Sequence, residues 1–227
     1  MPRSVMEHSF SNVPRVNIPR SSFNRSHGHK TTFDADYLIP ILVDDIIPGD
    51  TFNVNCSFVA RLATPLYPIM DNLYLETFFF FVPYRLVWDN WEKFCGAQDD
   101  PGDSISYTIP LVTGASTRTG EGYLWDYFGL PLDDGTGALH VDPDDLPTSA
   151  LPYRAYMLIW NEWFRDQNLQ NTKVVTTDDG PDTLSTDSTA ANKLIDSPLK
   201  RGKRHDYFTS ALPAPQRGTA VSMPPGS

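Results

Sequence analysis

The feature that most constrains the fold is a period-two alternation of apolar and polar side chains over residues 51–62. Apart from Val59, the alternation is regular, and it gives an extended chain one dry face and one wet face. Residues 73–82 form a second apolar run, interrupted only by Glu76 and Thr77. We expect this run to be an inner strand of a sheet sandwich. The chain is therefore predicted to be mainly β.

Proline and glycine indicate how the rest of the chain is organised. The 227 residues include 20 Pro and 14 Gly, and Pro disrupts both helices and inner strands. We therefore expect long loops and few, short helices, one of them at 86–94. Residues 96–150 hold ten acidic residues against Arg118 as the one Lys or Arg, and we predict a long acidic insertion there. Residues 176–192 are polar and acidic and are interpreted as a loop.

The strongest helix prediction covers residues 152–168. Pro152 suits the first turn of a helix, and Ser149 could cap it. The apolar side chains recur at helical spacing and form one stripe. The residues of this stripe that we expect to pack in the core are Tyr156, Ile159, Trp160 and Trp163.

Charge is distributed unevenly along the chain. The net charge is −10, yet residues 1–30 carry five cationic side chains against Glu7 alone, and the remaining residues carry 13 basic and 27 acidic side chains. Residues 1–32 are also rich in Pro, Ser and Asn, so we predict a basic extended arm, followed by one domain over 33–227. The cations of the arm are Arg3, Arg15, Arg20, Arg25 and Lys30.

The common signatures of catalysis and cofactor binding are missing from the sequence, and we expect neither enzymatic activity nor a cofactor. Two His flank Gly28, but a solvated pair is favoured over a weak metal site. The acidic runs at 99–100, 133–134 and 142–145 are interpreted as turns, with adventitious calcium as the alternative. Glu162 lies beside aromatic residues, where pairing with Arg165 is favoured over catalysis. We see no membrane span and no signal peptide.

The segment LPYRAYMLIWNEWFRDQNLQ at 151–170 strongly resembles the major capsid protein of the microviruses, in particular the gokushovirus branch. Further segments resemble the same family in the same order, and together the similarity covers nearly the whole chain. One departure is Ala214, where relatives usually carry Trp. The further segments are FSNVPR at 10–15, DDIIPG at 44–49, PLYPIMDN at 65–72, FFFFVPYRLVWDNW at 78–91 and KRHDYFTSALP at 203–213.

The resemblance implies an antiparallel eight-stranded jelly roll of viral capsid type with long loop insertions, incomplete in this chain because family members are much longer. It also implies pentamers and a sixty-subunit T=1 shell around circular single-stranded DNA. The implied location is the virion, assembled in the cytoplasm of a host bacterium. The implied partners are copies of the chain itself, the DNA and other virion proteins, with a host surface receptor as a further candidate.

The resemblance to capsid proteins leads to two expectations for the charged residues. We expect the five cations of the arm to contact DNA phosphates, with a disordered tail as the alternative. We expect four charged residues off the apolar stripe to contact neighbouring subunits, with a solvated face as the alternative. They are Arg154, Glu162, Arg165 and Asp166. Two other classes remain open: a β-sandwich module that binds a receptor or a carbohydrate, and a hydrolase whose site is split over distant segments.

Overall fold

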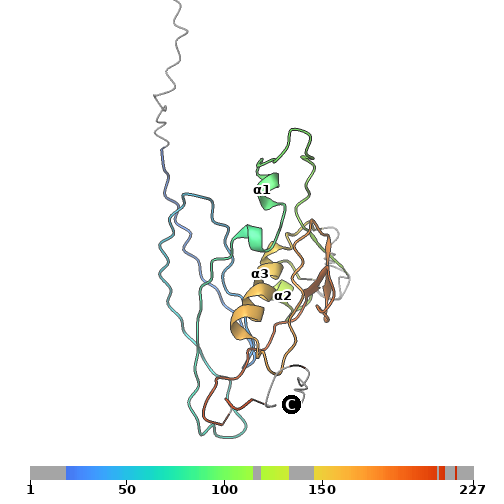
Figure 1. The fold of residues 1–227 in the computed structure, drawn as a ribbon. Coiled ribbons are helices and arrows are strands. Elements are labelled where there is room, and N and C mark those ends of the chain that lie inside the picture. Colours follow the sequence, from blue (N-terminus) through green and yellow to red (C-terminus); the bar gives the residue numbers. More distant parts are fainter. Residues whose placement is uncertain (1–18, 115–118, 133–145, 209, 213–217, 219–227) are drawn as a thin grey trace, which may run out of the picture. The chain divides into compact units, whose positions relative to one another are not determined.

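The computed structural model describes residues 19–114, 119–132, 146–208, 210–212 and 218. Backbone contacts divide the chain into Met1–Lys30 and Thr31–Ser227. In the first unit, residues 19–30 are exposed and without regular secondary structure. The second unit contains all the helices and strands of the described residues (Figure 1). In chain order these are η1 (Tyr84–Leu86), α1 (Trp91–Phe94), β1 (Val112–Thr113), α2 (Leu124–Tyr127), α3 (Leu151–Ile159), η3 (Trp160–Phe164), β2 (Asp182–Ser185) and β3 (Lys193–Ile195).

The predicted helix at 152–168 exists but is shorter. Its start is fixed locally, because Pro152 lies in the first turn and the Leu151 N–H donates to Ser149 Oγ at 3.3 Å. After α3 the helix continues as the π-helical turn η3, and it ends where Arg165 takes an extended backbone. The Arg165 N–H donates to the Trp160 carbonyl at 2.8 Å. The helix therefore ends four residues before the predicted boundary.

The core forms where α3 packs against the small sheet and α2. Tyr153, Tyr156 and Met157 of α3 are buried there. Most of their partners come from segments that the sequence pattern assigned to loops, at 96–150 and 176–192. Burial of large apolar side chains stabilises a fold by about 1.5–3 kcal/mol each, so these segments are part of the core. The partners are Val112, Leu124, Trp125, Ala150, Leu184, Leu194 and Ile195.

The sheet of the described residues differs from the expected antiparallel arrangement. Its order is β1-β2-β3, and both pairings are parallel, with Val112 opposite Asp182 and Thr183 opposite Lys193. Parallel neighbours require a long crossover, and the chain between β1 and β2 contains α2 and α3. Antiparallel contact is limited in the described residues to two isolated bridges, Tyr37 with Lys200 and Leu111 with Ser149.

The strands expected at 51–62 and 73–82 are not formed in the described structure. Both ranges lie within it, and both run without regular secondary structure (Figure 1). Their apolar side chains remain largely exposed, for example Val54 at 57% and Phe79 at 57%. The alternation specifies which face of a strand is dry, but a strand also requires a neighbour to accept and donate its backbone hydrogen bonds. Among the described residues these segments lack that neighbour.

Candidate functional site

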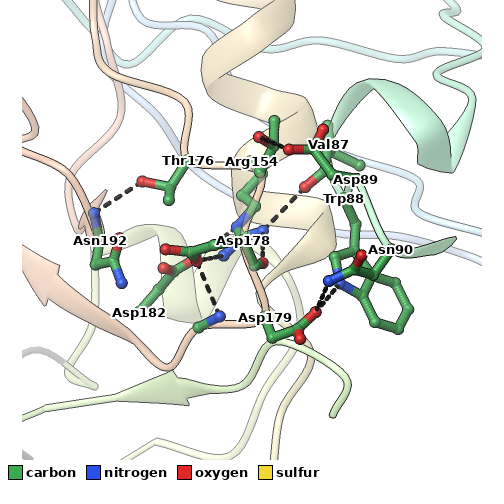
Figure 2. A network of polar contacts seen from close by, with 12 residues as sticks. Val87, Trp88, Asp89, Asn90, Arg154, Thr176, Asp178, Asp179, Asp182 and Asn192 are labelled. Carbon is green, nitrogen blue, oxygen red and sulfur yellow. Dashed lines mark hydrogen bonds and ion pairs between the residues drawn. The ribbon is translucent and has the colours of Figure 1, made fainter. Parts of the chain in front are cut away.

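Arg154 lies inside the subunit and not at its surface. Its side chain is fully buried, and its Nε donates to Asp182 Oδ2 at 2.6 Å (Figure 2). Its Nη1 donates to the carbonyls of Val87 at 3.0 Å and Asp178 at 2.8 Å, and its Nη2 lies 3.3 Å from Asp178 Oδ1. The expectation that Arg154 contacts a neighbouring subunit is therefore wrong, because the buried Asp182 and the two carbonyls satisfy its guanidinium within the chain.

Hydrogen bonds next to Arg154 also join residues 177–179 to residues 88–90, which lie between η1 and α1. Asp179 Oδ1 accepts from Trp88 Nε1 at 2.6 Å and from Asn90 Nδ2 at 3.0 Å (Figure 2). The Asp89 N–H donates to the Thr177 carbonyl at 2.8 Å, and Thr177 Oγ1 donates to Asp89 Oδ2 at 2.7 Å. These partly buried and exposed hydrogen bonds join the two segments beside the buried pair of Arg154 and Asp182.

A second group of polar contacts lies at the C-terminal end of the helix, around η3. Trp160 Nε1 donates to the Lys200 carbonyl at 2.8 Å, and the Gly202 N–H donates to the Phe164 carbonyl at 2.5 Å. A Cβ on Gly202 would lie 3.1 Å from the Asp166 nitrogen and 3.2 Å from the Phe164 oxygen, so this close approach requires glycine. Beside this approach lies an open pocket of about 190 Å³, which we call the helix-end pocket. It is lined by Trp163, Phe164, Arg165, Asp166, Arg201, Gly202, Lys203, Arg204 and His205.

Cations dominate the helix-end pocket. Glu76 forms ion pairs with both Arg201 and Arg204. The two guanidinium groups also lie over aromatic rings, Arg201 5.8 Å from the Phe164 centroid and Arg204 5.0 Å from that of Tyr74. Lys203 and His205 make no hydrogen bond or ion pair with any residue that the structure describes.

The stripe predicted for core packing is split by the π-helical turn. Tyr156 and Trp160 are buried at 5% and 2% exposure, and Ile159 is half-buried. Trp163 is 72% exposed, contrary to the predicted core position. A π turn takes more residues per turn than an α-helix, so the side chain at 163 rotates away from the stripe and Phe164 is buried in its place, at 7% exposure.

The remaining charged residues of the helix end differ in their surroundings. Glu162 is exposed, whereas Arg165 and Asp166 are half-buried. Arg165 Nη1 donates to the Gln170 carbonyl at 2.9 Å, and the Asp166 N–H donates to Gln170 Oε1 at 2.9 Å. Arg165 and Asp166 thus help to form the turn that follows the helix, and Glu162 is the one most exposed to solvent.

The predicted arm is described only in part. Arg3 and Arg15 lie outside the described residues, and Arg20, Arg25 and Lys30 are exposed. The acidic runs at 133–134 and 142–145 also lie outside them. No three His, Cys, Asp or Glu side chains cluster as metal ligands within the residues described. Over the same residues, no helix is long and apolar enough to cross a membrane.

Two phenols of α3 are held in the core. The Tyr156 hydroxyl donates to the Leu38 carbonyl at 2.9 Å and accepts from the Leu199 N–H at 2.8 Å. Burial raises the pKa of Tyr156 and that of Tyr153 above the ordinary value. Both phenols are therefore neutral over the physiological range; Tyr153 serves in packing, and Tyr156 in packing and hydrogen bonding.

Comparison with known proteins shows the family. Residues 11–227 match the model of the family described as capsid protein (F protein). The capsid protein VP1 of Bdellovibrio phage phiMH2K is 49% identical over 221 residues, which cover 97% of this chain and 38% of that protein. The capsid protein VP1 of Chlamydia phage 1 is 44% identical over 97% of this chain and 37% of its own length. The capsid protein VP1 of Spiroplasma virus 4 is 34% identical over 95% and 38%.

These matches extend over nearly the whole chain, although the chain spans less than two fifths of the length of these relatives. They confirm the resemblance to microvirus capsid proteins that the segment at 151–170 indicated. They also agree with the expectation of a structural protein without enzymatic activity. The chain belongs to the phage capsid protein (F protein) family.

Proposed function

We propose that this chain is part of a major capsid protein that assembles through pentamers into a sixty-subunit T=1 shell around circular single-stranded DNA. Its partners are copies of itself, the DNA, other virion proteins and a host surface receptor. Its location is the virion, after assembly in the bacterial cytoplasm. The family match supports the structural role, and one feature of the fold supports assembly in particular.

That feature is the apolar surface of residues 51–82. Soluble monomers seldom expose large contiguous apolar patches, and such patches mark surfaces that become covered. Over this range the side chains of Phe58, Leu62, Leu73 and Phe81 are 46%, 55%, 63% and 72% exposed. The alternation over 51–62 is also typical of a strand with one buried face, and in the described structure no neighbouring strand covers it. Extended chain with free backbone groups and apolar side chains pairs readily with further strands. We therefore propose that these segments become antiparallel strands of a jelly roll when further strands cover them.

The proposal is tested with a matched pair of substitutions in the full-length capsid protein. Phe58 lies on the dry face of the alternation, whereas Val59 breaks it and lies on the wet face, at 99% exposure. Phe58→Asp should abolish particle formation, because it would bury a charge in the covered face. Val59→Asp should leave assembly intact. Particles are counted by electron microscopy and sedimentation. Equal assembly of both variants would contradict the jelly-roll proposal, and a wild-type protein that stays monomeric would contradict the capsid role.

The arm is proposed to face the shell interior and to contact DNA phosphates. Five cations within the first 30 residues precede a strongly acidic remainder, and phosphate contact releases counterions without regard to sequence. Replacing Arg3, Arg15, Arg20 and Arg25 together by Gln should reduce the DNA content of purified particles and their sensitivity to salt. Unchanged packaging and salt sensitivity would show that the arm has another role.

Glu162 is proposed to contact a neighbouring subunit. It is the exposed member of the charged set on the helix, while Arg165 and Asp166 are partly engaged by their own chain. Glu162→Lys should block assembly and leave subunit folding intact, and a compensating charge reversal on the neighbouring subunit should restore particles. If Glu162→Lys subunits assemble as well as the wild type, Glu162 belongs to a solvated face.

A further inference from the structure

The helix-end pocket places an unusually exposed indole beside cations. Trp163 is 72% exposed, and its ring lies 5.7 Å from that of Phe80, at an angle of 54°. Phe80 therefore supports the indole on one side, while most of its surface faces solvent. A large aromatic side chain exposed to this degree gains free energy when another group covers it. Aromatic faces open to solvent beside cations are what proteins use to stack the bases of single strands.

Besides Arg165, the basic side chains of the pocket fall into two groups. Arg201 and Arg204 share the carboxylate of Glu76, which partly neutralises them. Lys203 and His205 are exposed, and in the described part of the chain neither has a hydrogen-bond or ion-pair partner. An ammonium group without an internal partner is available to an external anion, and a phosphodiester is the anion that comes together with a stackable base.

The pocket is fixed by the fold and is not a chance arrangement of surface side chains. The Trp160 indole N–H donates to the Lys200 carbonyl at 2.8 Å, and the Gly202 N–H donates to the Phe164 carbonyl at 2.5 Å, so the end of the helix is bonded to the backbone of residues 200–202. This backbone also bonds to the segment at 36–38, with Arg201 N–H donating to the Asp36 carbonyl at 2.9 Å. The two backbone segments that carry Trp163 and Lys203 are thus bonded to each other next to the pocket, which limits the ordering cost of binding.

The size of the pocket restricts the ligand. Its volume of about 190 Å³ is several times the roughly 30 Å³ that one water molecule occupies in the liquid. It is smaller than the roughly 300–1,000 Å³ of sites for drug-sized molecules. Space on this scale suits one unit of a polymer, a single base or a single phosphate, with the rest of the strand running over the surface.

We propose that the helix-end pocket binds one nucleotide of single-stranded DNA, with the base stacked on Trp163 and the phosphate held by Lys203 and His205. The proposal rests on the proposed enclosure of DNA by the shell, and it names a binding site apart from the arm. Tyr207 and Phe208, which are 91% and 85% exposed, follow the cations closely in the chain.

The test measures binding of a fluorescent twelve-residue oligothymidylate to the full-length protein by anisotropy, at several salt concentrations. Trp163→Leu should weaken binding by roughly 5- to 150-fold, the range expected for loss of one stacked base. Lys203→Gln should weaken binding and reduce the slope of log affinity against log salt by about 0.7, the value for one phosphate contact on a single strand.

Matched controls lie outside the pocket. Tyr67 is 82% exposed, so Tyr67→Leu removes an exposed aromatic ring elsewhere. Lys93 forms an exposed ion pair with Asp99 at 3.8 Å, so Lys93→Gln removes a surface cation elsewhere. Both controls should bind oligothymidylate within about twofold of the wild type.

The outcomes separate this inference from the proposed function. If Trp163→Leu and Lys203→Gln bind like their controls, the pocket is not a nucleotide site, whether or not particles contain DNA. If hexaglutamate displaces the oligonucleotide as well as oligothymidylate does, the pocket selects any acidic chain and the inference is overturned. Failure of the proposed function would appear elsewhere, as wild-type particles that contain no DNA. Ultraviolet crosslinks from packaged DNA to peptides spanning 160–165 and 203–208 would support the inference, and crosslinks confined to the arm would overturn it.

Discussion

The network around Arg154 allows a quantitative prediction. The change is Arg154→Met, which retains much of the side-chain volume and removes the guanidinium. The variant would leave the Asp182 carboxylate fully buried without its cation. Asp182 Oδ1 has no hydrogen-bond partner within the described structure. The buried negative charge of Asp182 is therefore compensated through the ion pair between its Oδ2 and Arg154.

The size of the effect follows from these contacts. Removing one partner of a buried ion pair costs about 3–5 kcal/mol, since the other charge remains uncompensated. The carbonyls of Val87 and Asp178 also lose a charged donor. Replacing both charges, in Arg154→Met/Asp182→Leu, should recover most of the loss because no buried charge remains. Arg154→Lys should fall between, since one ammonium cannot reproduce the several directed bonds of the guanidinium.

The assay is native-state hydrogen exchange of the full-length protein, read by mass spectrometry. Peptides from 84–90, 151–159 and 178–185 should lose protection by a factor of about 150 to 5,000 in Arg154→Met, corresponding to the estimated cost. Lys93→Met is the control, because its ion pair with Asp99 is exposed and such pairs contribute less than about 1 kcal/mol. A loss of protection below tenfold in Arg154→Met, or one equal to that of the control, would refute the reasoning.

Two further predictions concern the packing of the helix and its end. Gly202→Ala should destabilise the protein by about 1–3 kcal/mol, because the added Cβ meets backbone atoms at 3.1–3.2 Å and overpacking costs about that much; a thermal melt measures it, and an unchanged melting temperature would contradict the close approach. Tyr156→Phe should cost about 1 kcal/mol in urea unfolding, because the partly buried Leu199 N–H loses its acceptor. Burial raises the pKa of Tyr156, so its contribution is complete below the unfolded pKa of about 10 and is lost as pH rises through the higher folded value. Absorbance at 295 nm should therefore show Tyr156 ionising only together with alkaline unfolding, and reversible ionisation in the folded protein would contradict this.

Local sequence signals predicted local features of the chain well. The start of the helix near Pro152 depends on residues within one turn, and the structure begins it at Leu151. The single short helix expected at 86–94 is only partly confirmed, because the structure has two separate elements there, η1 at Tyr84–Leu86 and α1 at Trp91–Phe94. The end of the long helix was misplaced, because a π turn rather than a polar residue ends the regular pattern at Phe164.

The candidate site could be predicted only in part. The sequence has four cationic residues within 200–204, and it predicted Trp163 as an aromatic of the apolar stripe. Trp163 and these cations line one pocket because Gly202 approaches Phe164, which lies 38 positions earlier in the chain. The π turn also rotates Trp163 away from the position that α-helical periodicity predicts. The signal available in the sequence was Gly202 between two cations, followed by Tyr207 and Phe208.

The sequence by itself determined the family, the segregation of charge between arm and body, and the local start of the main helix, because each depends on residue identity or on neighbours in the chain. Tertiary structure alone decided that Arg154 is buried, because its partners Val87 and Asp182 lie 67 and 28 positions away. It also decided that parts of the acidic insertion and of the polar segment at 176–192 belong to the core, through Trp125 and Leu184. The alternation over 51–62 specifies a dry face, but a strand forms only where another strand supplies its hydrogen bonds, and no residue within the segment can supply that partner.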